Sequence, residues 1–525
     1  MSAKIATILN SPKSRVGLPA FWGVIGFVIA AWSFDEKLSL SGDNAEFITL
    51  ARSIAQGEGL SYINDAKPKV ATKYPFGFPL MLAPLSWIYS SEQQENNTLG
   101  GDPVRDFIAM KWLVVVLFGV LSSAVYVLAR EHLEDLSASV VALLCAAHPK
   151  LVEYGSQVMS EIPYTLFSIV ALFLFERSAR NQNCLTNKWL ISGFVFMMWS
   201  YYVRSVGVVL VAAVILFFAI NRQYRRAILL TVLSFVIALP WALRNHFTGR
   251  GSVYATQFLQ VNPYHPDRGY LDIGGLFDRV LNNLNVYLIH IIPKTFWPSF
   301  TGAESALNIV TLVIFSVIIY AGYLCIRQRT HLLLWVYVLL FSVLIFLWPW
   351  VGDRFLLPII PLLLFLAVYA GRNFFGKLQV LAGRPVTVVL CFTTISVLFL
   401  SEVEGLQEQV KYARGPYQPG WQQYYDAGMW IRNNLEEDTI ISCRKGFWMH
   451  VVSGRRTVGY KFKEPEALLA DMKNKGVDYV VVDRLPFNST TRYLIPAIKK
   501  NANHFRIVFQ RKNSQTYVLA FQDSP

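Results

Sequence analysis

The sequence predicts a polytopic α-helical membrane protein with a small α/β domain at its C-terminal end. Hydrophobic residues make up 54% of the 525 residues and charged residues only 16%, a more apolar balance than soluble proteins have. Apolar runs of about 18 residues recur between residues 16 and 400, and a helix of that length crosses a bilayer. After about residue 402, short apolar segments alternate with helical patterns, as in a soluble α/β domain.

The net charge of +14 is distributed in a way that argues against nucleic acid as a partner. The basic residues lie mainly in short loops between apolar runs, where the positive-inside bias of membrane proteins places them. The five cysteines form neither a disulfide framework nor a zinc-binding pattern. The N-terminal residues lack a small-residue cleavage site, so the first apolar run is predicted to be an uncleaved helix.

Eleven apolar segments are predicted to span the membrane. They cover residues 16–34, 107–128, 136–154, 162–175, 189–203, 206–220, 227–243, 307–326, 332–348, 355–370 and 386–400. This count puts the N-terminus in the cytoplasm and the C-terminal tail outside, with nearly every basic cluster in the cytoplasm. We therefore expect an integral protein of the bacterial inner membrane whose C-terminal domain is periplasmic or extracellular.

One further apolar segment, residues 76–89, is not counted as a span. It is short and is interrupted by prolines, so we interpret it as a second surface helix or a re-entrant helix. Counting it as a span would invert every later loop and move the basic clusters to the outside.

Two long outer loops are predicted within a membrane domain of residues 1–402. They cover residues 35–106 and 244–303. In the first, apolar residues from Ala45 to Ala55 recur near helical spacing, which predicts a short helix lying along the membrane surface. The soluble domain, residues 403–525, is predicted to have helices at 421–435, 465–474 and 490–501 and strands at 439–443, 477–483, 505–511 and 515–521.

Three acidic residues are candidates for chemistry at the outer membrane face. Asp43 and Glu46 open the first outer loop, and Glu161 begins a predicted span on the same side. Ionisable groups at membrane depth are costly, and two converging carboxylates can bind an acceptor and remove its proton. Structural roles stay open, since Asp43 can cap a helix and Glu161 is favoured at a helix start by the helix dipole.

Four cations accompany these acids on a face where basic residues are not expected. They are Lys73, Arg204, Arg244 and Arg354. Arginine binds phosphate through two parallel hydrogen bonds and lysine binds it as a point charge, and the phosphate of a lipid carrier lies at this depth. The alternative for each cation is contact with lipid headgroups or an ion pair, such as Arg354 with Asp353.

Short motifs around these residues carry a resemblance to a known family. The motifs are Asp43-Asn-Ala-Glu46, Tyr74-Pro-Phe-Gly-Phe-Pro79, Ser160-Glu-Ile-Pro163, Arg204, Pro240-Trp-Ala-Leu-Arg-Asn245 and Arg354-Phe-Leu-Leu-Pro358. With them, residues 16–400 resemble the C-type (GT-C) membrane glycosyltransferases, which take a sugar from a polyprenyl-phosphate carrier. The chain looks most like the relatives of protein O-mannosyltransferases and of the lipid A aminoarabinose transferase.

The resemblance implies roles for particular residues. Asp43 and Glu161 would be the catalytic acids. Carrier-phosphate or substrate contacts would come from Lys73, Tyr74, Arg204, Arg244 and Arg354, with Asn44 and Glu46 as secondary candidates. The chain departs from the family in having Asn44 where the mannosyltransferases have the second residue of an acidic pair, and a single Pro75 where two prolines are frequent.

These observations predict a glycosyltransferase that moves a monosaccharide from a polyprenyl-phosphate donor to a hydroxyl of a glycan, lipid or protein. Asp43 would be the general base, and the cations would stabilise the departing phosphate. No cofactor is predicted, and a need for a divalent metal is left open. Two other hypotheses remain: a transporter or flippase for a lipid-linked saccharide, and a non-catalytic assembly subunit that docks through its soluble tail.

Overall fold

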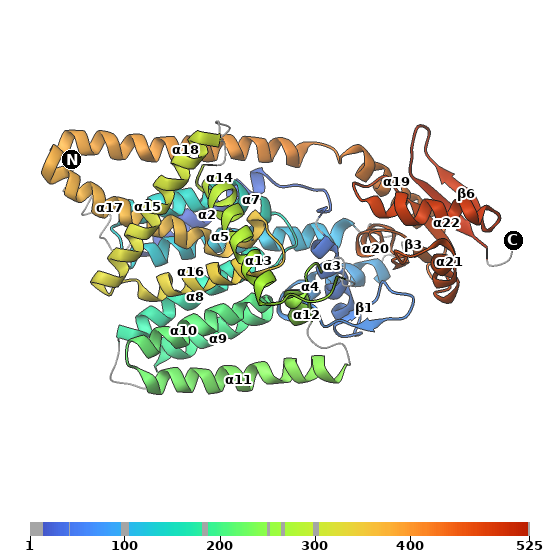
Figure 1. Cartoon of the computed structure of the whole chain (residues 1–525), viewed down its shortest axis with the longest axis horizontal. Coiled ribbons are helices and arrows are strands. Elements are labelled where there is room, and N and C mark those ends of the chain that lie inside the picture. The colour runs from blue at the N-terminus through green and yellow to red at the C-terminus, as the bar shows by residue number, and fades with distance from the viewer. Residues whose placement is uncertain are drawn as a thin grey trace.

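The computed structural model describes residues 14–40, 42–95, 104–180, 187–248, 253–263, 268–297 and 304–522. Figure 1 shows a body of long helices with an α/β domain at one end of the longest axis. Parts of the two predicted outer loops, at residues 41, 96–103, 249–252, 264–267 and 298–303, lie outside the described residues.

A helix or helix pair covers all or most of each of the eleven segments predicted to span the membrane. They are α2 (Ser14–Trp32), α5 (Val104–Arg130), α6 (Asp135–Ala147) with α7 (Pro149–Gly155), α8 (Glu161–Arg180), α9 (Lys188–Val203), α10 (Val208–Ile220), α11 (Tyr224–Phe247), α15 (Glu304–Gln328), α16 (Leu332–Leu347), α17 (Ile360–Ala382) and α18 (Arg384–Arg414). By length and apolar content, six described helices can cross a bilayer, or seven if the bent α6–α7 pair is one span. The number of crossings, eleven, therefore stays a prediction.

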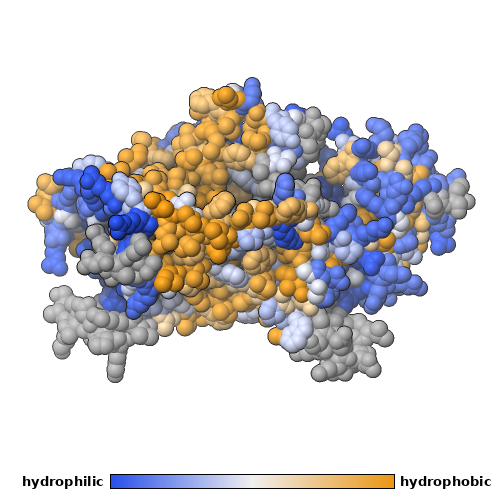
Figure 2. All heavy atoms as spheres, turned by 90° about the horizontal axis from the view of Figure 1, so that it is seen from below, coloured by the Kyte–Doolittle hydropathy of each residue, from blue (hydrophilic) through white to orange (hydrophobic). Residues whose placement is uncertain are grey.

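The surface of the helical body is suited to a bilayer. Figure 2 shows a broad apolar area over this body, with hydrophilic residues toward both ends of the molecule. Large apolar side chains such as Phe235 on α11, Leu312 on α15 and Phe392 on α18 are exposed. Water-exposed patches of this extent are rare in soluble proteins, whereas a helix surrounded by lipid needs them. The chain is thus a polytopic membrane protein.

Small residues bring the first helix close to α5. A Cβ atom added to Gly26 would lie 2.2 Å from Ser122 Oγ, and one added to Gly119 would lie 2.8 Å from the Gly23 carbonyl oxygen. Such contacts between small residues are a common way for membrane helices to pack. They fix the end of α2 and therefore the start of the loop that carries Asp43.

The first loop contains two helices, α3 (Gly42–Ala55) and α4 (Gly77–Glu95), joined by a hairpin of β1 (Ser61–Tyr62) and β2 (Lys69–Val70). Helix α3 differs from the predicted surface helix, because residues 44–51 are all buried. It packs against α4 on one side and against α20 (Gly446–Ser453) of the C-terminal region on another. The C-terminal region covers a face that sequence periodicity assigned to the membrane surface.

The C-terminal region has a five-stranded mixed sheet with the order β4-β3-β5-β7-β6. Its elements are α19 (Pro419–Asn434), β3 (Ile440–Ser442), α20, β4 (Arg456–Val458), α21 (Pro465–Asn474), β5 (Tyr479–Val482), η5 (Thr490–Leu494), α22 (Ile495–Lys500), η6 (Ala502–His504), β6 (Phe505–Gln510) and β7 (Tyr517–Phe521). Strand β3 is parallel to β4 and β5, and β7 is antiparallel to β5 and β6. Helix α20 and strand β4 were not predicted.

The connection between the two parts is helical. Helix α18 continues through the predicted boundary at residues 402 and 403 and ends at Arg414. In Figure 1 it runs along one side of the molecule toward the α/β domain. Lys37, just after α2, donates a hydrogen bond of 2.7 Å from Nζ to the Ala413 carbonyl oxygen near the end of this helix.

Short elements complete the end of the helical body nearest the C-terminal region. Between α11 and α15 they are α12 (Val253–Leu259), α13 (Ile273–Val286), η3 (Tyr287–Ile291) and α14 (Ile292–Phe296). The 3-10 turns η1 (Ser205–Gly207) and η4 (Asp353–Ile359) precede α10 and α17. Both turns carry predicted site residues, because Arg204 immediately precedes η1 and Arg354 lies within η4.

Candidate active site

Five of the predicted site residues lie at the ends of helices and meet at one end of the helical body. Asp43 is in the first turn of α3 and Glu161 is the first residue of α8. Lys73 lies just before α4, and the two arginines, Arg204 and Arg354, lie at the turns η1 and η4. Irregular backbone at these ends lets side chains from five segments point into the same space.

Asp43 forms ion pairs with two cations. Its Oδ2 atom lies 2.6 Å from Arg354 Nη2, and its Oδ1 atom lies 3.4 Å from Lys73 Nζ. Burial alone would raise the pKa of Asp43, but Lys73 and Arg354 together outweigh that effect and hold it well below the usual aspartate range. Asp43 is therefore a carboxylate at neutral pH, although a weakly basic one.

Glu161 is fully buried and pairs with Arg354, the same arginine that pairs with Asp43. Its Oε1 atom lies 2.8 Å from Arg204 Nη1 and 3.4 Å from Arg354 Nε. Arg204 also donates a 2.9 Å hydrogen bond to Ser160 Oγ. Arg354 thus bridges the two carboxylates, so the catalytic acids suggested by the motifs are held by one guanidinium.

Glu46 extends the cluster on the other side of Asp43. Its Oε2 atom lies 2.8 Å from Lys73 Nζ, and its Oε1 atom accepts a 2.7 Å hydrogen bond from the Tyr62 hydroxyl. Burial raises the pKa of Glu46 despite the charge of Lys73. Burial also disfavours the charged form of Lys73, yet Glu46 and Asp43 raise its pKa.

The charges therefore alternate through the site. In spatial order they run Glu46, Lys73, Asp43, Arg354, Glu161 and Arg204. The three acids and three bases give no net charge. A buried or half-buried cluster of this kind is stable only while each charge keeps its partner. A ligand that brings its own negative charge would have to displace one of the carboxylates from a cation.

A cavity of about 740 Å³ opens beside this cluster. Its polar wall is formed by Asp43, Lys73, Ser160, Arg204 and Arg354. Its apolar and aromatic wall includes Tyr74, Tyr254, Phe341, Leu344, Trp348 and Trp350. The cavity thus joins a charged end to an apolar end, the arrangement needed for a phosphate attached to a hydrocarbon chain.

A second cavity, of about 430 Å³, reaches the same cluster from the C-terminal region. Gly42, Asp43, Lys73 and Lys445 line both cavities. The remaining wall of the second cavity comes from the first loop and from α20, β4 and neighbouring residues, and its polar members include Asn64, Asp65, Lys69, Arg444, Thr457 and Lys475. Asp43 is thus accessible from two sides.

Three predicted residues are absent from the walls of both cavities. Glu161 is fully buried and pairs with Arg204 and Arg354. Arg244 donates hydrogen bonds to the carbonyl oxygens of Ala71 at 2.9 Å and Leu60 at 3.3 Å, so it anchors the segment that leads to Lys73. Asn44 is fully buried in α3 and is absent from both cavity walls. None of the three is placed to contact a ligand in these cavities.

Other residues at the site were not found by sequence reasoning. Tyr254 lies on the short helix α12 in the second outer loop, and its ring centroid is 6.2 Å from that of Tyr74. Lys445 precedes α20 in the C-terminal region and approaches the cluster across more than 400 residues of sequence. No local pattern marks either residue, because both reach the site through tertiary packing.

Comparison with known proteins finds a matching family model and similar solved structures. Residues 105–244 match the family model described as dolichyl-phosphate-mannose-protein mannosyltransferase. No protein with a curated description matches the sequence. Similar solved structures include the oligosaccharyltransferase of Archaeoglobus fulgidus tethered with an acceptor peptide, at 14% identity and a TM-score of 0.60, which covers 96% of this chain and 74% of that one.

ArnT from Cupriavidus metallidurans is similar over almost the whole of both chains. In the apo state it is 13% identical with a TM-score of 0.58, covering 97% of this chain and 98% of that one. Bound to undecaprenyl phosphate it is 12% identical with a TM-score of 0.54, covering 98% and 99%. The chain has the GT-C fold. The predicted resemblance to GT-C membrane glycosyltransferases is therefore confirmed.

Proposed function

We propose that this protein is a glycosyltransferase that moves a monosaccharide from a polyprenyl-phosphate carrier to a hydroxyl acceptor on the extracytoplasmic face of the membrane. The observation that carries the proposal is the meeting of Asp43 and three cations at one cavity with an apolar wall, with the buried Glu161 paired to two of those cations. The GT-C fold supports it, as do the family match and the undecaprenyl phosphate bound to the similar ArnT structure.

The donor phosphate would bind to the cations of the 740 Å³ cavity. Arg354 is the central contact, because it faces the cavity and holds both carboxylates in the free protein. Lys73 and Arg204 lie on either side of it and can contact further phosphate oxygens. The aromatic and aliphatic side chains of α16 and its following turn would accommodate the first isoprene units.

Donor binding would also prepare Asp43 for catalysis. In the free protein its two cations make it a weak base. When a phosphate shares Arg354 and Lys73, part of their positive charge is neutralised, so the pKa of Asp43 rises toward that of an ordinary aspartate. The carrier phosphate then both presents the sugar and increases the basicity of the group that activates the acceptor.

The reaction would be a direct displacement at the anomeric carbon. The acceptor oxygen forms a bond to that carbon while the bond from the carbon to the phosphate oxygen breaks. The bonding electron pair leaves with polyprenyl phosphate, and the acceptor proton passes to a carboxylate oxygen of Asp43. Arg354, Lys73 and Arg204 stabilise the negative charge that grows on the phosphate, and Glu161 keeps the two arginines in position. The anomeric configuration is inverted.

The acceptor would enter through the 430 Å³ cavity beneath the C-terminal region. Among the described residues, no carboxylate lies within ion-pair distance of Arg444 or Lys445. Instead, both cations lie over the ring of Phe487, at 4.9 Å and 4.5 Å from its centroid. Since the neighbouring Lys69 and Lys475 are already paired with Asp65 and Asp471, Arg444 and Lys445 are the cations free to bind. They favour an acceptor that carries negative charge next to its hydroxyl.

The experiment that tests the proposal is sugar transfer from polyprenyl-phosphate donors in proteoliposomes with Asp43→Asn. Loss of a general base lowers the rate by about 10²- to 10⁴-fold. Asp353→Asn is the matched control, because Asp353 is exposed at the same end of the molecule and pairs with Lys150 away from the cavity wall. A folded Asp43→Asn protein with full activity would rule out the mechanism.

A further inference from the structure

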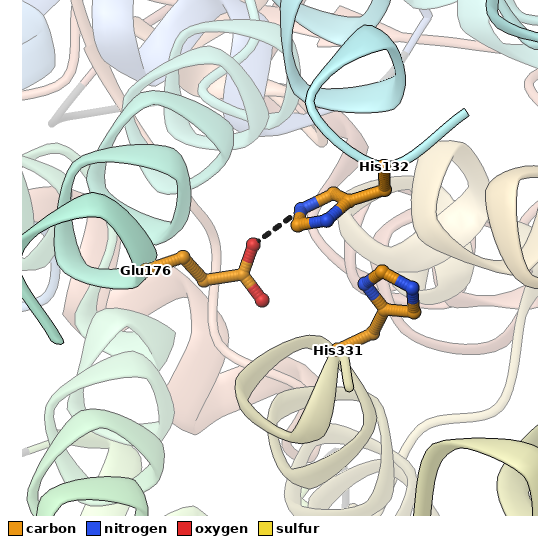
Figure 3. A group of neighbouring side chains, drawn as sticks. All are labelled: His132, Glu176 and His331. Atoms are coloured by element: carbon orange, nitrogen blue, oxygen red, sulfur yellow. Dashed lines mark hydrogen bonds and ion pairs between the residues drawn. The ribbon is translucent and has the colours of Figure 1, made fainter. Parts of the chain in front are cut away.

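A second cluster of ionisable side chains lies far from the candidate active site. Glu161 and Glu176 are both on α8, and their separation of 15 positions corresponds to roughly 22 Å of helix. Around Glu176, at the opposite end of that helix, lie His132, just after α5, and His331, at the start of α16. Figure 3 shows the three side chains pointing toward one another from three segments of the bundle.

The three side chains bring their donor atoms to one point. His132 Nε2 lies 2.6 Å from Glu176 Oε2, and one donor atom from each of the three residues lies within 4.8 Å of the others. The side chains of His132 and Glu176 are only 7% and 8% exposed. The donors of a tetrahedral zinc site are ~3.3 Å apart, so changes of at most about 1.5 Å in their separations bring these atoms to the spacing of metal ligands.

One ring nitrogen of His331 has no hydrogen-bond partner among the residues that the structure describes. This nitrogen, Nδ1, is buried. Its backbone has φ 53° and ψ 23°, a left-handed conformation that residues other than glycine seldom adopt. A buried, unpaired nitrogen on a strained backbone is unfavourable unless something binds it.

Aromatic side chains around the cluster pack against the two imidazole rings. The rings of His132 and His331 meet edge to face at 4.2 Å between centroids. Phe365 packs against both, and Tyr369 packs against His331 at 4.6 Å. The packing fixes the His331 ring and leaves its Nδ1 atom without a hydrogen bond among the described residues.

The nearby arginines do not neutralise Glu176. Arg177 and Arg180 both pair with Glu131 instead, Arg177 at 2.8 Å and Arg180 at 2.5 Å. Among the described residues, the ion-pair partner of Glu176 is His132. A divalent cation would replace the proton between these two side chains and would also satisfy His331.

We propose that His132, Glu176 and His331 bind one divalent transition-metal ion, with zinc as the best fit to two imidazoles and one carboxylate. Water would complete the coordination. The ion would join the end of α5, the end of α8 and the turn between α15 and α16, which otherwise contact one another through side chains alone. The site would stabilise the bundle, and it does not depend on the proposed transfer reaction.

Metal content of the full-length protein in detergent tests the proposal. The native protein, loaded with Zn²⁺ and passed through a desalting column, should retain one zinc ion per chain. His331→Asn should lose it, and asparagine tolerates the left-handed backbone at this position, so that variant should fold. Glu176→Gln should lose it as well. His290→Ala is the control, because His290 is exposed on another element and should leave the zinc in place.

Substitution with Co²⁺ supplies an independent readout. The native protein should show visible absorption bands of four- or five-coordinate cobalt, and these bands should be absent in His331→Asn. The proposal is overturned if the native protein retains no zinc, or if both ligand variants retain it as the control does.

Discussion

Replacing Arg354 with glutamine tests the electrostatic argument at the candidate active site. The side chain binds Asp43 at 2.6 Å and Glu161 at 3.4 Å, so its loss leaves two carboxylates without the cation they share. Loss of one preorganised donor to a developing negative charge costs about 2.7–4 kcal/mol in the transition state, which is on the order of 10²- to 10³-fold in kcat. Arg354→Lys keeps the charge but cannot reach both carboxylates, so we expect a smaller loss.

The same change alters the pH dependence of transfer. Arg354 helps Lys73 to lower the pKa of Asp43, so its removal raises that pKa. The acid limb of kcat/KM, measured for the free protein in proteoliposomes, should therefore move to higher pH. Arg372→Gln, which removes an exposed arginine paired with Glu134, should change neither quantity. A kcat and a pH profile for Arg354→Gln equal to those of the native protein would refute the role given to Arg354.

Three further predictions address the acceptor, the packing and the acid stability. Arg444→Gln should raise KM for an anionic acceptor while donor binding, measured by lipid retention, stays unchanged, because Arg444 lines the second cavity and is absent from the wall of the first; a weakened donor affinity would contradict the two-cavity arrangement. Gly77→Ala should lower the free energy of unfolding by about 1–3 kcal/mol, and therefore Tm, because the added Cβ would lie 2.5 Å from the Tyr202 carbonyl oxygen. An unchanged melting curve would show that α4 and α9 are not in contact. The lowered pKa of Asp43 stabilises the fold above the unfolded pKa of about 4, and that stability is lost as pH falls below it. The Tm difference between the native protein and Asp43→Asn should therefore shrink below about pH 4, and a constant difference would argue against the ion pairs.

Much of the helical body could be predicted because apolar length is a local property. Helices cover all or most of each predicted span, although the span predicted at residues 136–154 is bent at His148, where Pro149 starts a second helix. The burial of α3 against the C-terminal region could not be predicted. Its apolar residues have the same spacing whether they face lipid or a protein domain, and here α20 covers it.

The candidate site could be predicted in part because charges at membrane edges are unusual. Asp43, Glu161, Lys73, Arg204 and Arg354 stand out against apolar sequence, and the structure brings them together. Their pairing, with Arg354 shared between two acids, depends on helices more than 100 residues apart and has no local pattern. The same is true of Lys445.

The cluster of His132, Glu176 and His331 shows this limit most clearly. Metal sites are found in sequences by short spacings such as two ligands on one helical turn. These three residues are separated by 44 and 155 positions in the sequence, and only the packing of α5, α8 and the turn before α16 brings them together. The two histidines come from the ends of helices that sequence reasoning treated as simple boundaries.

The most direct measurement is a density map of the full-length protein with bound polyprenyl phosphate. The account predicts that the phosphate lies in the 740 Å³ cavity against Arg354 and Lys73, with the 2.6 Å contact between Asp43 and Arg354 lengthened or broken. A phosphate bound elsewhere, with that ion pair intact, would contradict it.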